Sequence, residues 1–194
     1  MIVTLKIVHT PVMKEEVLSY LHPQDTDGLF IDATLGEGGH AELFLEEYPG
    51  IRIVGVDADT SIIGKAKKRL SRFEDRITFV NSWFNTFFKE YPDTLERPDR
   101  ILFDLGVSLY HFESAERGFS FSKDGPLDMR IEQSLEISAA DIVNEYPEEE
   151  IAKIVFEYGE ERYSRRIAKA IVTFRKDASI QSTDQLKEIV WKAV

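Results

Sequence analysis

The feature that most restricts the fold of this chain is the segment FIDATLGEGGHAEL, residues 30–43. An apolar run ends in the carboxylate of Asp32, a glycine-rich turn follows from Gly36 to Gly39, and a helical pattern begins directly after it. A buried strand that leads through a tight glycine turn into a helix presents backbone N–H groups to a nucleotide in α/β proteins. We therefore predict a parallel sheet with a nucleotide-like ligand at the carboxyl ends of its strands.

Strands and helices alternate through the first half of the chain. Short apolar runs predict strands, and apolar residues at helical spacing predict the helices between them. The predicted strands are 29–34, 51–57, 76–80 and 100–106, and the predicted helices are 11–21, 39–48, 61–70 and 83–89. Near-continuous apolar runs that alternate with helices are typical of a parallel sheet covered on both faces. Residues 1–110 are therefore predicted to form an α/β domain.

The alternation ends after the fourth predicted strand. Residues 106–136 are predicted to be a loop, because glycines and a proline interrupt every period. From Ser138 onward the sequence predicts helices, with a capping box at SAAD and another helix cap at Ser182 or Thr183. We predict a second, mostly helical region over residues 111–194.

Composition excludes several classes of protein. The 194 residues contain no cysteine, which excludes disulfides and thiolate metal sites, and no metal site is predicted. No apolar run is long enough to span a membrane, and the N-terminal MIVTLKIV is too short for a secretory signal, so we expect a cytoplasmic protein. A net charge of −11 argues against non-specific coating of nucleic acid but leaves room for a local basic face.

The glycine turn fits the dinucleotide pattern G-x-G-x-x-G/A, and Asp57 ends the second predicted strand where a carboxylate could bind ribose hydroxyls. The pattern alone is weak, so an NAD-dependent oxidoreductase and a turn without a ligand remain alternatives. Two features favour S-adenosylmethionine over NAD. Asp32 suits a ligand with an ammonium group, and Glu37 would repel a pyrophosphate with no nearby cation to offset it.

Several blocks of the sequence resemble one known family, and they occur in the same order as in that family. The blocks are HTPVMKEEVL (9–18), DATLGEGGHA (32–41), VDAD (56–59), LFDLGVS (102–108), AERGFSFSKDGPLDMR (115–130) and YGEERYSRRIAKAI (158–171). Together they resemble the bacterial 16S ribosomal RNA (cytosine-N4)-methyltransferase family, called RsmH or MraW. The resemblance runs from His9 to the end of the chain, and the block 115–130 is its most specific part.

This resemblance implies transfer of a methyl group from S-adenosylmethionine to the exocyclic N4 amine of a cytidine in 16S ribosomal RNA of the small ribosomal subunit. It implies a Rossmann-like methyltransferase sheet and a helical substrate-recognition region. The cofactor contacts that it implies fall on Gly38, Gly39, His40, Asp57, Phe84, Asp104 and His111. Asp57 would hold the ribose and Phe84 would lie against the adenine. His111 stands where the family usually has a glutamine, because this chain reads SLYH in place of SSPQ.

The catalytic candidate is Asp104, chosen by its position at the end of the fourth predicted strand. A cytosine amine is conjugated and weakly nucleophilic, so a nearby acceptor must take charge or a proton as the methyl group transfers. The target base must also be single-stranded or flipped out of its stack.

Four arginines are candidates for substrate binding. Arg117 and Arg130 lie in the block 115–130, where they could contact substrate or form structural ion pairs. Arg162 and Arg166 share a predicted helical face with Arg165 and Lys169, at positions i, i+3, i+4 and i+7. The alternative is that these four cations form an ordinary solvent-exposed helix face without a ligand.

Four predicted strands are fewer than the seven that such a sheet commonly has, and members of the family continue further. We therefore expect this chain to be a truncated portion whose sheet is incomplete. A non-catalytic form that binds the cofactor or the ribosome is the corresponding alternative function. The sequence leaves open the modified nucleotide, the oligomeric state, and whether naked RNA or the assembled subunit is the substrate.

Overall fold

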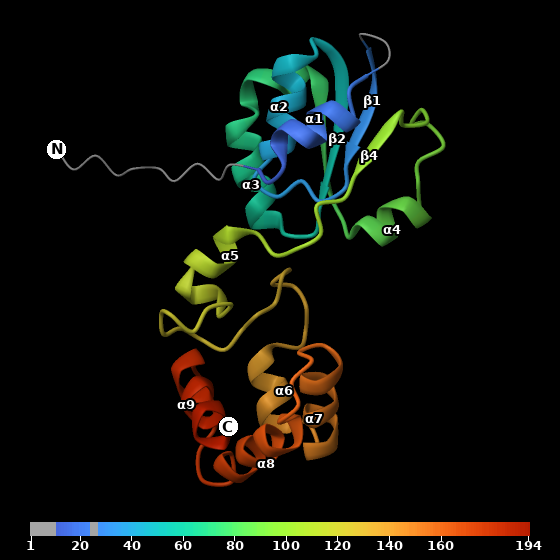
Figure 1. Cartoon of the computed structure of the whole chain (residues 1–194). Coiled ribbons are helices and arrows are strands. Elements are labelled where there is room, and N and C mark those ends of the chain that lie inside the picture. Colours follow the sequence, from blue (N-terminus) through green and yellow to red (C-terminus); the bar gives the residue numbers. More distant parts are fainter. Residues whose placement is uncertain (1–10, 24–26) are drawn as a thin grey trace, which may run out of the picture. The chain divides into compact units, whose positions relative to one another are not determined.

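The computed structural model describes residues 11–23 and 27–194, which form two compact units (Figure 1). The first unit ends at Val107 and the second begins at Ser108. The N-terminal apolar run, His9 and part of the predicted turn before the first strand lie outside the described residues.

The first unit contains a four-stranded parallel sheet with the strand order β3-β2-β1-β4. The strands are β1 (Asp27–Asp32), β2 (Gly50–Asp57), β3 (Ile77–Asn81) and β4 (Arg100–Leu102). The helices are α1 (Lys14–Tyr20), α2 (Gly39–Glu47), α3 (Thr60–Arg69), the 3-10 helix η1 (Ser71–Arg76) and α4 (Phe84–Lys89). This strand order is that of one half of a Rossmann-like sheet, and the predicted α/β fold class is confirmed.

Apolar side chains cover both faces of this sheet. On β1, the side chain of Phe30 packs into one cluster, where its ring lies 4.5 Å from that of Phe44 on α2. Leu29 and Ile31 alternate to the opposite face and pack with Phe87 of α4. Successive residues of a strand point to opposite faces, so a strand buried on both sides reads as a continuous apolar run.

The second unit is mostly helical. Its helices are α5 (Leu109–Glu113), the 3-10 helix η2 (Ala115–Arg117), α6 (Ala139–Glu145), α7 (Glu148–Glu157), α8 (Ser164–Phe174) and α9 (Thr183–Ala193). Capping boxes at Ser138 and Ser182 begin α6 and α9, as predicted. Their shared core contains Val143, Ile151, Ile167, Ile171 and Ile189. No helix within the described ranges is long and apolar enough to cross a membrane.

The prediction of an uninterrupted loop over residues 106–136 is wrong at its beginning, where α5 and η2 form. The hydroxyl of Ser108 accepts a hydrogen bond from the backbone N–H of Tyr110 and caps α5. Such short helices are stabilised by caps and packing rather than by a long apolar period, so the periodicity of the sequence does not reveal them.

The remaining loop is attached firmly to the helical core. Leu127 is buried in that core, and its N–H donates to the carbonyl of Gln181, 3.0 Å away, just before α9. Gly118 has a φ of +70°, and a Cβ atom there would lie 2.4 Å from the carbonyl oxygen of Pro126. Only glycine fits such an approach without strain, which gives a packing reason for one glycine of the block 115–130.

Candidate active site

Three carboxylates meet at the carboxyl edge of the sheet. Asp32 ends β1, the strand between β2 and β4, and its register partners are Gly55 on β2 and Leu102 on β4. Asp57, the last residue of β2, and Asp104, two residues after the end of β4, therefore each lie two residues beyond the level of Asp32. In open α/β sheets this edge is where ligands bind.

Asp32 is the most deeply buried of these acids, with 1% of its surface exposed. Burial, with a smaller contribution from the negative charges of Asp57 and Asp104, raises the pKa of Asp32 from 3.8 to about 7. The backbone N–H groups of Thr34 and Ala41 lower this pKa in part. Neither carboxylate oxygen has a partner at full hydrogen-bond geometry within the described part of the chain. A buried carboxylate of this kind is suited to a cationic ligand group.

The glycine turn is closed by a contact with Asp57. The N–H of Gly36 donates to Oδ2 of Asp57 at 2.8 Å, and the N–H of Asp59 donates to its Oδ1 at 2.9 Å. Gly38, the N-cap of α2, has a φ of +80°, and a Cβ atom there would lie 2.7 Å from Cδ1 of Leu70. This glycine is therefore required by packing of the chain itself, so its presence is not by itself evidence for a ligand.

The expectation that no cation offsets Glu37 is wrong. Nζ of Lys65 on α3 lies 3.2 Å from Oε1 of Glu37. This pair is 28 residues apart in the sequence and is formed only when α3 folds beside the turn. The charge of Glu37 therefore does not argue against a pyrophosphate.

The backbone of Asp104 is hydrogen-bonded to Thr34, and its side chain lies near His40. Its N–H donates to Oγ1 of Thr34 at 2.7 Å, which ties the end of β4 to the loop after β1. Its Oδ2 lies 3.8 Å from Nε2 of His40, a buried residue that follows Gly39 in the first turn of α2. The side chain of Asp104 is 44% exposed, so it remains accessible to a substrate.

Phe84 begins α4 and is partly buried. Its ring lies edge-on to that of Phe103, with centroids 5.4 Å apart, and Phe103 directly precedes Asp104. The predicted residues Gly38, Gly39, His40, Asp57, Phe84 and Asp104 thus all belong to the first unit. Their contacts with a cofactor stay predictions.

His111 belongs to the second unit, where it is buried in α5. Its ring lies 5.0 Å from that of Phe119, among the aromatic residues of the loop. The proposed contact between His111 and the cofactor stays a prediction.

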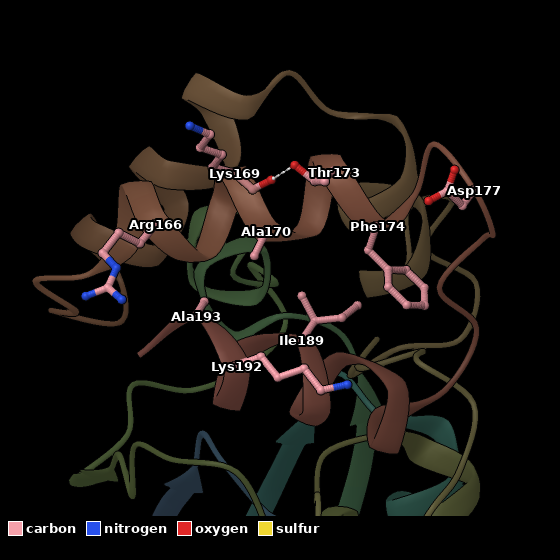
Figure 2. Close-up of a pocket in the computed structure, with 9 residues that line it drawn as sticks. All are labelled: Arg166, Lys169, Ala170, Thr173, Phe174, Asp177, Ile189, Lys192 and Ala193. Carbon is pink, nitrogen blue, oxygen red and sulfur yellow. Dashed lines mark hydrogen bonds between the residues drawn. The ribbon is translucent and has the colours of Figure 1, made fainter.

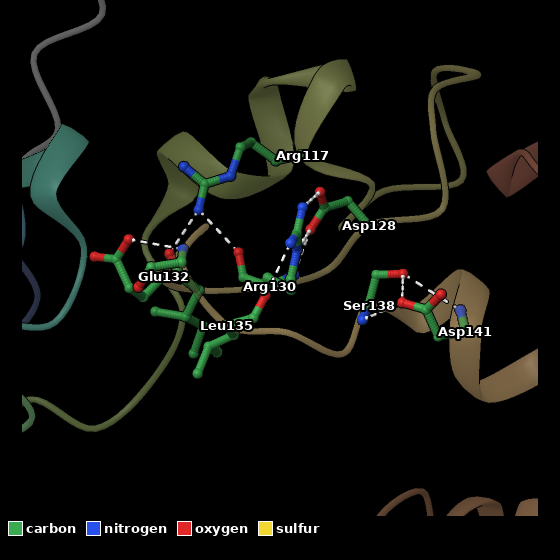
Figure 3. A network of polar contacts seen from close by, with 9 residues as sticks. Arg117, Asp128, Arg130, Glu132, Leu135, Ser138 and Asp141 are labelled. Carbon is green, nitrogen blue, oxygen red and sulfur yellow. Dashed lines mark hydrogen bonds and ion pairs between the residues drawn. The ribbon is translucent and has the colours of Figure 1, made fainter.

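Arg117 and Arg130 organise the loop in which they lie (Figure 3). The buried guanidinium of Arg117 donates to the carbonyl oxygens of Arg130 and Ile131, at 3.0 and 2.7 Å. Arg130 donates through Nε and Nη2 to both carboxylate oxygens of Asp128, at 2.9 and 2.8 Å. The nearby guanidinium holds the pKa of Asp128 below its ordinary value. The structural ion pair foreseen for this block is therefore present at Arg130, whereas a role of either arginine in substrate binding stays a prediction.

Arg162 and Arg166 do not share one helical stripe, because α8 begins at Ser164 and Arg162 lies ahead of it. Both guanidinium groups are instead placed against the ring of Tyr163, with 4.6 and 5.3 Å between guanidinium carbon and ring centre. Arg166 does lie on α8 and is exposed. Substrate contacts of Arg162 and Arg166 stay predictions. No cluster of potential metal ligands occurs in residues 11–23 and 27–194.

Comparison with known proteins decides the family. Residues 6–194 match the model of the MraW methylase family. The chain belongs to the MraW methylase family. This confirms the resemblance seen in the sequence.

Two relatives show how much of a MraW methylase protein is present. The chain is 51% identical over 187 residues to the ribosomal RNA small subunit methyltransferase H of Treponema denticola, covering 96% of this chain and 59% of the relative. It is 42% identical over 189 residues to the protein of the same name from Borreliella afzelii, covering 96% of this chain and 64% of the relative. The chain therefore spans about three fifths of the length of these curated relatives.

A solved structure, the C-terminal domain of precorrin-6Y C5,15-methyltransferase from Rhodobacter capsulatus, is similar with a TM-score of 0.43 and 15% sequence identity. The match covers 62% of this chain and 63% of that one.

Sequence reasoning missed two contributors to the site, Thr34 and Phe103. Thr34 meets Asp104 only after β1 and β4 pair, and these strands are separated by two other strands in the sequence. Phe103 directly precedes Asp104, but its contact with Phe84 forms only in the folded chain. Only the Rossmann-like strand order, applied to the predicted strands, could have placed Thr34 beside Asp104.

Proposed function

We propose that the chain is part of an S-adenosylmethionine-dependent methyltransferase that modifies the N4 amine of a cytidine in 16S ribosomal RNA. The main support is the arrangement of Asp32, Asp57 and Asp104 around the glycine turn, in a chain of the MraW methylase family. The relatives' name, ribosomal RNA small subunit methyltransferase H, supports the small ribosomal subunit as partner. The reaction would take place in the cytoplasm.

The residues at the sheet edge fit the parts of this cofactor. The carboxylate of Asp57 accepts hydrogen bonds from the backbone N–H groups of Gly36 and Asp59, which hold it beside the glycine turn, where we place the ribose of the cofactor. Asp32 offers a buried carboxylate to the ammonium group of the methionine part. The ring of Phe84 offers an apolar surface for the adenine. When bound, the cofactor supplies an electrophilic methyl group.

Asp104 is proposed to act on the substrate amine. The lone pair of that amine is delocalised into the cytosine ring, and the amine must lose a proton as it gains a methyl group. Asp104 accepts a hydrogen bond from the amine and then this proton. Thr34 fixes the backbone of Asp104, and His40 lies where its imidazole can steady the carboxylate. Asp104 would therefore affect turnover more than binding of the cofactor.

A transfer assay with radiolabelled S-adenosylmethionine and small ribosomal subunits from cells lacking the gene tests this proposal. We expect label in N4-methylcytidine after nucleoside digestion and mass spectrometry. Asp104→Asn should lower the rate by at least about 100-fold, the usual contribution of a positioned acid or base. The matched control is Asp93→Asn, which removes an exposed acid elsewhere in the first unit and should leave the rate unchanged.

Label in another nucleoside would contradict the assignment to the N4 amine. A chain that binds S-adenosylhomocysteine but transfers no label would support the non-catalytic alternative. Equal rates for Asp104→Asn and the unsubstituted chain would remove Asp104 from the mechanism.

A further inference from the structure

We propose that the groove between α8 and α9 in the second unit binds a single-stranded segment of RNA. This inference rests on the proposed function for the choice of RNA as the ligand, and it adds a specific surface to that function. The groove is a hollow of about 560 Å³. It is lined by Arg166, Lys169, Ala170, Thr173, Phe174, Asp177, Ile189, Lys192 and Ala193.

The groove combines an apolar floor with cations at its sides. Phe174 of α8 and Ile189 of α9 extend into the space between the helices, and the Lys192 stem runs toward Phe174 (Figure 2). The guanidinium of Arg166 lies at the end opposite Phe174, and the ammonium of Lys169 projects away from α9 (Figure 2). A strand of RNA can therefore place phosphates on cations and a base against an apolar wall.

The basic side chains of α8 lack carboxylate partners in the part of the chain that the structure describes. Arg165, Arg166 and Lys169 form no ion pair with a carboxylate of the described residues. Lys192 has an exposed pair with Glu188 at 3.7 Å, which contributes little to stability and yields easily to another anion. In a chain with a net charge of −11, such a concentration of uncompensated cations indicates an anionic partner.

Phe174 indicates that this partner carries bases. The ring is 37% exposed beside the cations. Stacking of a base on an aromatic ring strengthens binding and requires an unpaired base. An acidic protein surface would satisfy the cations but would gain nothing specific from this ring.

A second hollow, between α7 and the start of α8, is less suited to RNA. It has a volume of about 730 Å³ and shares Arg166 with the groove. However, Glu148 and Glu149 line it, and carboxylates repel phosphates. Only one acid, Asp177, lines the groove between α8 and α9.

Fluorescence anisotropy with a labelled single-stranded RNA of about 12 nucleotides tests the proposal. We expect Arg166→Gln/Lys192→Gln to weaken binding roughly tenfold at 0.1 M salt and to reduce the log–log salt slope by about 1.4, or 0.7 for each lost phosphate contact. The matched control is Lys68→Gln/Lys187→Gln, which removes two exposed cations that do not line the groove and should change the affinity less than about twofold.

Phe174→Leu keeps an apolar side chain in the groove but removes the ring. We expect about tenfold weaker binding of single-stranded RNA with an unchanged salt slope, and little change for the same RNA in a duplex. Circular dichroism verifies that each variant is folded, and calorimetry with S-adenosylhomocysteine verifies the cofactor site separately.

Equal losses for the groove pair and the control pair would overturn the proposal, as would absence of RNA binding by the unsubstituted chain. Competition by polyglutamate as strong as that by RNA, with no effect of Phe174→Leu, would identify an acidic protein as the partner and also overturn it. Failure of the proposed function would instead appear as loss of S-adenosylhomocysteine binding, whatever the RNA result.

Discussion

The glycine turn of the first unit and α8 of the second unit differ in how their charged side chains are paired. Around the glycine turn, cations are paired with acids of the chain, as in Lys65 with Glu37 and Arg69 with Glu42. On α8 of the second unit, Arg166 and its basic neighbours have no such acid among the described residues. In the first unit the unusual charge is instead a buried carboxylate, Asp32.

This difference indicates two kinds of ligand. A buried carboxylate without full hydrogen-bond partners costs free energy in the empty protein and is stabilised by a small cation that fits beside it. Exposed cations cost little, and they gain most from a large polyanion that releases its counterions on binding. The contrast therefore supports the proposals that the cofactor binds to the first unit and nucleic acid to the second.

The largest predicted effect is the pH dependence of stability that Asp32, the buried carboxylate of the first unit, should cause. Its pKa of about 7 in the folded chain lies above the ordinary value of 3.8, so the folded form holds the proton more tightly than the unfolded form. The contribution of Asp32 to the free energy of unfolding should therefore be greatest below about pH 4, and it should fall by roughly 4 kcal/mol as the pH rises from about 4 to about 7. Asp32→Asn should remove this dependence, as measured by urea unfolding from pH 4 to 8.

The affinity for S-adenosylhomocysteine should depend on pH in the opposite direction. An ammonium group pairs with ionised Asp32, so the affinity for S-adenosylhomocysteine should rise by up to about tenfold per pH unit as the pH approaches 7. Methylthioadenosine lacks the amino-acid part, so its binding should show neither this trend nor a response to Asp32→Asn. If both ligands depend on pH equally, Asp32 does not face an ammonium group.

A smaller effect on stability is expected when a buried arginine of the second unit is replaced than for Asp32, and almost none when an exposed arginine is replaced. Arg117→Gln should lower the free energy of unfolding by about 2–3 kcal/mol, because it removes a buried guanidinium and leaves two partly buried carbonyl oxygens without their donor. Arg162→Gln should change it by less than about 0.5 kcal/mol, because its guanidinium is exposed. Denaturant unfolding followed by circular dichroism measures both. Equal destabilisation by the two changes would mean that Arg162 also has a structural role.

The fold could be predicted well from the sequence where local signals and burial agree. The four strands follow from apolar runs, and the helix caps at Ser138 and Ser182 follow from side chains that bond to the backbone nearby. Short helices such as α5 could not be predicted, because packing and one cap at Ser108 stabilise them rather than a repeated pattern.

The site could be predicted only in part. Asp57 and Asp104 were recognised because they end predicted strands. The approach of His40 to Asp104 and the pairing of Lys65 with Glu37 join residues on different elements, so they depend on the folded sheet. The stripe that includes Arg162 was predicted by extending the helix two residues too far, since a helical period does not mark where a helix begins.

The most direct test of the central claim is calorimetric titration of the chain with S-adenosylhomocysteine, with NAD as the competing ligand. The account predicts micromolar binding of S-adenosylhomocysteine and none of NAD. It also predicts loss of that binding in Asp57→Asn and its retention in Asp75→Asn, which changes an exposed acid away from the sheet edge. Binding of NAD, equal affinities for the two variants, or no binding by a chain that circular dichroism shows to be folded would contradict the assignment of the cofactor to this edge.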